Sequence, residues 1–115
     1  MNAERFARIK TAFERNGGII DQSREAQRLL RYHKAEAATL NAKTIIPQPN
    51  PMNAAIFEEL IHTAQYRTGR ATGANIVEME IEAAKKLLRF AGKYELNEED
   101  VKEIQSRLNH LLMVS

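Results

Sequence analysis

The 115-residue chain contains no cysteine, only three prolines and five glycines, and few aromatic residues. The lack of cysteine excludes disulfide scaffolds, thiolate metal sites and a cysteine nucleophile. No apolar run approaches the roughly 20 residues that a membrane-spanning helix needs, and the first residues lack the apolar core of a signal peptide. We therefore expect a cytoplasmic protein with no membrane segment, folded as a single domain over residues 1–115.

The net charge is small and unevenly distributed. Lys and Arg outnumber Asp and Glu by 17 to 15, which gives a net charge of +2 and does not by itself indicate a nucleic-acid partner. Residues 1–57 carry nine basic and five acidic side chains, whereas residues 58–115 carry eight and ten. Apolar residues make up 43% of the chain, which is typical of a globular protein with a core of sufficient size.

Hydrophobic periodicity and turn residues divide the chain into seven expected elements. We expect helices over residues 2–15, from 21 or 23 to 35, from a start between 51 and 53 to beyond 64, over 75–91, and from 97 onward. We expect strands over residues 19–20 and 39–46. The second helix is expected to bury Ala26, Leu29, Leu30 and His33. The sequence thus predicts an α+β, mostly helical fold of about five helices with a small two-stranded sheet.

The third helix combines an apolar face with a face rich in carboxylates around His62. At 100° per residue its apolar face consists of Phe57, Leu60, Ile61 and Ala64, and the residues that flank His62 on the opposite face are Glu58, Glu59, Gln65 and Tyr66. Glu58 and His62 are one turn apart, so both can reach one metal ion, and Glu59 could then hold a water as general base. The same pattern fits a solvated polar face, and both interpretations stay open.

On the fourth helix, Glu80 lies at the centre of the apolar arc. An ionised carboxylate in such a place is costly unless it is paired, protonated or bound to a metal. We expect its partner on the third helix, either His62 directly or a metal bound there. Glu82 lies on the solvated side of the same helix.

The order of several features along the chain resembles that of small zincin-like metallopeptidase domains. These features are Gly17-Gly18, a helix, the segment Thr44-Ile45-Ile46, a proline-rich turn, the stretch from Glu58 to Arg67, and then Glu80 to Ala83. Such domains occur in phage- and prophage-encoded proteins and in bacterial polymorphic toxins. The resemblance covers about residues 13–112, with Glu-Glu-x-x-His in place of the zincin motif His-Glu-x-x-His. It implies that Glu58 and His62 are metal ligands and that Glu59 is the base. For the third ligand, zincin spacing favours Glu82, whereas the helical phase favours Glu80.

The resemblance also implies a function. It predicts a metal-dependent, zinc peptidase-like protein, associated with phage or mobile elements, that acts on a protein or peptide substrate. Two carboxylates and one imidazole suit a single divalent ion, Zn²⁺ foremost, and also Mn²⁺ or Fe²⁺. Tyr66, one turn after His62, is a candidate contact to the developing oxyanion.

Three other interpretations compete with this one. The first is a catalytically inactive zincin-like domain that serves as an interaction or phage accessory module. The second is a di-iron site, because Glu59 and His62 also form Glu-x-x-His, although a homodimer would have to supply the second motif. The third is nucleic-acid binding by the basic stripe of Arg24, Arg28 and Arg31. The sequence does not indicate an oligomeric state.

Overall fold

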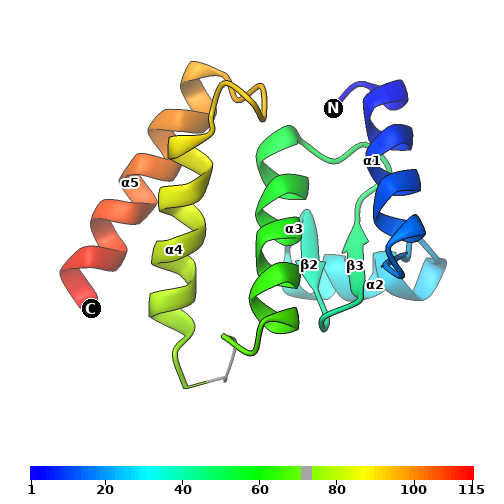
Figure 1. Cartoon of the computed structure of the whole chain (residues 1–115), viewed down its shortest axis with the longest axis horizontal. Helices are drawn as coiled ribbons and strands as arrows, with labels where there is room; N and C mark the ends of the chain where they lie inside the picture. Colours follow the sequence, from blue (N-terminus) through cyan, green and yellow to red (C-terminus); the bar gives the residue numbers. More distant parts are fainter. Residues whose placement is uncertain (71–73) are drawn as a thin grey trace.

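Five helices and one three-stranded sheet make up residues 1–70 and 74–115, the part of the chain that the computed structural model describes. In chain order the elements are α1 (Ala3–Arg15), β1 (Ile19–Ile20), α2 (Arg24–His33), β2 (Ala37–Thr39), β3 (Thr44–Pro47), α3 (Asn53–Arg67), α4 (Ile76–Arg89) and α5 (Glu98–Val114) (Figure 1). The predicted α+β, mostly helical class is confirmed, and the sheet has one strand more than predicted.

Local capping sets where three of the helices begin. The Asn2 side chain accepts hydrogen bonds from the first turn of α1, and Ser23 accepts one from the N–H of Ala26 at the start of α2. Asn97 and Asp100 form a reciprocal capping box at α5. Each cap satisfies N–H groups that have no partner within their own helix, so these boundaries follow from short sequence patterns.

The prediction of one continuous strand over 39–46 is wrong, because the chain turns at residues 40–43, between the end of β2 at Thr39 and the start of β3 at Thr44. The side chain of Asn41 accepts hydrogen bonds from the N–H groups of Lys43 and Thr44 and so folds the chain back on itself. β3 becomes the central strand, parallel to β1 and antiparallel to β2. The sheet order is therefore β1-β3-β2.

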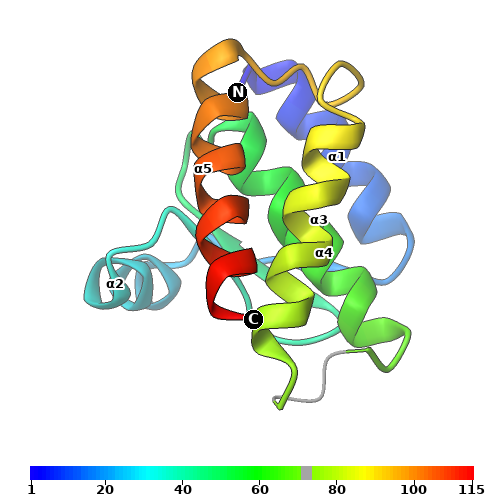
Figure 2. The ribbon, with the colours of Figure 1, turned by 90° about the vertical axis from the view of Figure 1, so that its left-hand side faces the viewer.

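The sheet carries a helix on each face. Successive side chains of a strand point to opposite faces: Ile46 packs with Ala26 and Leu30 of α2, whereas Ile45 packs with Ile56 of α3. Figure 2 shows α2 to one side of the other four helices. The prediction that Leu29 and His33 are buried is wrong, since both side chains are exposed, that of Leu29 by 38%.

Helix α3 is the centre of the molecule, with the sheet on one side and α4 on the other (Figure 1). A second part of the core forms where α4 and α5 pack beside it, from Ile61, Ala83, Ala84, Leu87, Ile104 and Leu108. Because α3 is covered on both sides, its polar face is buried as well, through Glu59, His62, Thr63 and Gln65. Over the described residues no helix has the length and apolar character needed to cross a bilayer.

Candidate metal centre

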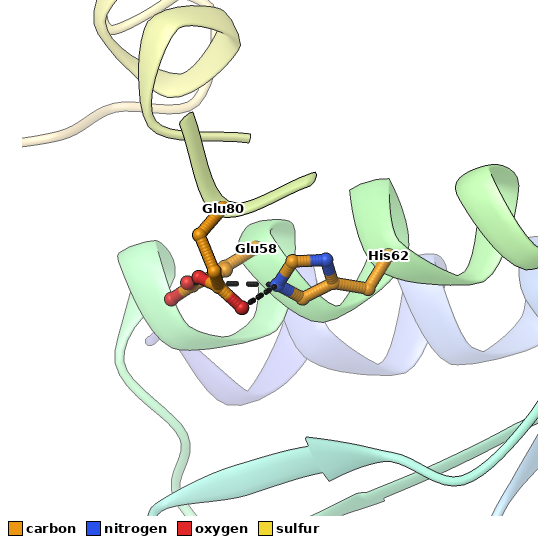
Figure 3. Close-up of side chains that lie close together, drawn as sticks. All are labelled: Glu58, His62 and Glu80. Carbon is orange, nitrogen blue, oxygen red and sulfur yellow. Dashed lines mark ion pairs between the residues drawn. The ribbon is translucent and has the colours of Figure 1, made fainter. Parts of the chain in front are cut away.

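Two helices bring three of the predicted metal ligands together. Glu58 and His62 lie one turn apart on α3, and Glu80 approaches from α4 (Figure 3). The Nε2 atom of His62 is 3.7 Å from Oε1 of Glu58 and 3.3 Å from Oε1 of Glu80. One potential ligand atom from each residue lies within 4.8 Å of the other two. Glu80 thus has a partner on the third helix, as its helical phase predicts.

The environment of His62 combines burial with several hydrogen-bond acceptors. Burial by itself lowers the pKa of the imidazole, but the acceptor oxygens of Glu58, Glu80 and Gln65 more than offset this effect and raise the pKa to about 11. In turn, the hydrogen bond from His62 lowers the pKa of Glu80, against the opposing effect of burial. Without a cation the cluster is an imidazolium between two carboxylates, and a metal has to displace its proton.

Arg107 of α5 adds a second positive charge to this cluster. Its Nη2 atom lies 3.2 Å from Oε1 of Glu58, so one carboxylate oxygen faces both Arg107 and His62. The sequence did not identify Arg107 as part of the site. The only signal was its place at the border of the apolar stripe of α5, where a long side chain can lie along the packed surface and extend its charge beyond it.

Glu59 lies beside the cluster but has a different environment. Its side chain is buried, and its Oε1 atom accepts a hydrogen bond of 3.2 Å from the hydroxyl of Thr39 on β2. Burial raises the pKa of Glu59 to about 7, although the positive charge of His62 works against this. A carboxylate with a pKa near neutrality is suited to accept and release protons.

The cluster opens into a cleft of about 420 Å³ between β2, α3 and α4. The cleft is lined by Ala37, Ala38, Thr39, Glu58, Glu59, His62, Tyr66, Ile76, Met79 and Glu80. Tyr66 belongs to this lining and is 40% exposed, and its predicted role toward an oxyanion stays a prediction.

Glu82 lies outside the cluster. Its Oε1 atom accepts hydrogen bonds from Nη1 of Arg70 at 2.8 Å and from Nε2 of Gln65 at 3.2 Å. Over residues 1–70 and 74–115, the group that could share one ion consists of Glu58, His62 and Glu80. The helical phase therefore identified the residue that faces His62, and the zincin spacing did not.

Gln65, like Arg107, belongs to the site, although the sequence did not assign it a role there. It is 2% exposed, and its Oε1 atom lies 2.7 Å from Nδ1 of His62. The available signal was its position three residues after His62 on the same helix, where side chains are neighbours.

No protein family, curated protein or solved structure matches this chain. The zincin-like resemblance therefore stays a prediction, and the site is interpreted from its own geometry.

Proposed function

We propose that this chain is a metal-dependent, peptidase-like protein that holds one divalent cation between Glu58, His62 and Glu80. The observation that carries the proposal is the convergence of three potential ligand atoms from two helices at a cleft. Three protein ligands that include His and carboxylates are typical of catalytic zinc, which keeps a further position for water or substrate. Mn²⁺ and Fe²⁺ also accept this ligand set, with Zn²⁺ the first choice.

Glu59 is the proposed general base. A cation in this position would polarise a peptide carbonyl and acidify a water. Glu59 would take the proton of the attacking water and pass it to the leaving amine, a role that a buried carboxylate beside the metal can fill. The hydroxyl of Thr39 faces both the main-chain carbonyl of Glu59, at 3.0 Å, and Oε1 of its carboxylate, at 3.2 Å.

The edge strand β2 supports a peptide as the substrate. Across the hairpin, the N–H of Leu40 donates to the carbonyl of Thr44, and the carbonyl of Glu36 accepts from the N–H of Gln48. Backbone groups alternate in direction along a strand, so those of Ala37 and Thr39 point toward the open edge. Both residues line the cleft, and an extended peptide can add to an edge of this kind as a further strand.

A second candidate function follows from the ion pairs. Arg107 and protonated His62 together balance the charges of Glu58 and Glu80 without any metal. In that case the chain is a catalytically inactive zincin-like interaction or accessory module, and the cluster stabilises the contacts among α3, α4 and α5.

The experiment that tests the proposal is a titration of the purified chain with Zn²⁺ and Mn²⁺ by calorimetry, followed by a peptide-library cleavage assay. We expect one equivalent of metal to bind in the micromolar range or tighter, and His62→Ala to abolish binding. His110→Ala is the matched control, because His110 is an exposed histidine on α5. Glu59→Gln should bind metal but not cleave peptides.

Three outcomes separate the candidates. Binding no tighter than millimolar, unchanged by His62→Ala, would exclude the metal site. Tight binding without cleavage of any library peptide would favour the inactive module. Cleavage that persists in Glu59→Gln would overturn the role of this residue as the base.

A further inference from the structure

We propose that Gln65 is a positioning residue that selects the ring nitrogen through which His62 binds the metal. This inference rests on the metal site proposed above and explains a buried amide that the proposed reaction does not use. Figure 3 shows one ring nitrogen of His62 turned toward Glu58 and Glu80 and the other on the far side of the ring. The far nitrogen, Nδ1, is the one that Gln65 contacts.

The Gln65 amide has a hydrogen-bond partner at each end. Its Oε1 atom lies 2.7 Å from Nδ1 of His62. Its Nε2 atom donates to the main-chain carbonyl of Met79 at 3.0 Å and to Oε1 of Glu82 at 3.2 Å. A side chain that is 2% exposed needs such partners, because an unsatisfied buried amide is costly.

These partners determine which way the amide points. Rotating it by half a turn would place its oxygen against the carbonyl of Met79 and the carboxylate of Glu82, both of which only accept hydrogen bonds. The amide oxygen therefore faces His62. An amide oxygen cannot donate, so Nδ1 of His62 must carry the hydrogen of this bond.

In neutral His62 the lone pair is consequently on Nε2, the atom that faces Glu58 and Glu80. Without Gln65 no acceptor would hold the proton on Nδ1, and a neutral ring protonated at Nε2 could not bind a metal at this place. Histidines that bind metals generally donate their other N–H to an oxygen, which fixes the tautomer and the orientation of the ring. Here a neutral amide supplies that oxygen.

Glu82 thereby acquires a role other than that of a ligand. Its Oε1 atom is shared between Gln65 and Arg70, so the Arg70–Glu82 ion pair supports the amide from the surface. The resulting chain of contacts runs from Arg70 through Glu82 and Gln65 to His62. The pair is largely exposed, and we expect its effect to be weaker than that of Gln65.

The test compares Gln65→Met, which keeps the length of the side chain but neither accepts nor donates strongly, with Thr63→Val. Thr63 is equally buried, and its hydroxyl donates to the carbonyl of Glu59, so Thr63→Val removes a buried hydrogen bond on α3 without touching the imidazole. We expect Gln65→Met to weaken zinc binding by about 10- to 100-fold. Thr63→Val should lower the melting temperature but leave zinc affinity unchanged.

A second measurement uses only the wild-type chain, so it does not require that a variant folds. Long-range ¹H–¹⁵N spectra of the zinc-loaded wild-type chain report which nitrogen of His62 is protonated and which is bound to metal. We expect a protonated Nδ1 and a metal-bound Nε2. Coordination through Nδ1, or Gln65→Met binding zinc as tightly as wild type, would overturn the inference and leave the metal site standing. A wild-type chain that binds no zinc would overturn both.

Discussion

Replacement of Glu80 by Gln removes one of the two carboxylates that face His62 and keeps the shape of the side chain. The contact with Nε2 of His62 is 3.3 Å, and the Glu80 side chain is 32% exposed. A hydrogen bond between charged groups contributes about 1.5–3 kcal/mol when buried, and partial exposure reduces this, so we expect a loss of about 1–2 kcal/mol from the metal-free protein. For a domain of this size that corresponds to a fall in Tm of about 4–8 °C.

Unfolding in the presence of zinc distinguishes whether Glu80 is a metal ligand or only an ion-pair partner of His62. At a zinc concentration of 100 times Kd, binding stabilises the wild-type chain by about 2.7 kcal/mol, which is a rise in Tm of about 10 °C. Glu80→Gln should lose most of this rise, because a ligand is missing. Thermal unfolding followed by circular dichroism, with zinc and with a chelator, measures both effects.

Glu82→Gln is the matched control from the same helix. Glu82 is 41% exposed and paired with Arg70, and a glutamine there can still accept a hydrogen bond from Gln65, so we expect a change below about 0.5 kcal/mol. If the two variants behave alike with and without zinc, the assignment of Glu80 from its helical phase is wrong. If Glu80→Gln lowers Tm equally in both conditions, the cluster is a structural ion-pair network.

Three further predictions concern charge in the site. Glu59→Gln should raise the metal-free unfolding free energy by about 2–3 kcal/mol at pH 8 and leave it nearly unchanged at pH 4. Burial raises the pKa of Glu59 from 4.5 to about 7, so the buried carboxylate becomes unfavourable as the pH rises through that range. Urea unfolding at both pH values measures this, and equal stability of the variant and the wild type at pH 8 would contradict it. The pKa of His62 is raised from 6.5 to about 11, so its ion pairs contribute fully to stability below pH 6.5 and are lost as the pH rises toward 11. With a chelator present, the difference in unfolding free energy between wild type and His62→Gln should therefore shrink between pH 6.5 and 10. A constant difference would count against the ion pairs. Arg107→Gln should raise zinc affinity several-fold in calorimetry, because the guanidinium competes with a cation for Glu58; weaker binding would mean that Arg107 instead orients this carboxylate.

Features that depend on neighbouring residues could be predicted from the sequence. The caps at Asn2, Ser23 and Asn97 act within one turn of helix, so the helix starts could be located to within a few residues. The one-turn spacing of Glu58 and His62 and the phase of Glu80 are equally local. For this reason the three residues of the cluster could be named before their arrangement in space was known.

Features that depend on packing between distant segments could not be predicted in this way. The alternating pattern over 39–46 fits a continuous strand, whereas the pairing of Ala38 with Ile46 across the turn makes the segment part of a hairpin. The polar face of α3 has the composition of a solvated surface, yet the edge of the sheet and α4 cover it.

The completed site was decided by tertiary structure. Arg107 reaches Glu58 across 49 residues of sequence, and the amide of Gln65 is oriented by Met79 and Glu82 on another helix. The sequence by itself determined which side chains one helix presents on one face, because the helical repeat is a local property of the backbone. Which of them become buried, charged or oriented depends on the surfaces that pack against that face, and these come together only when the whole chain folds.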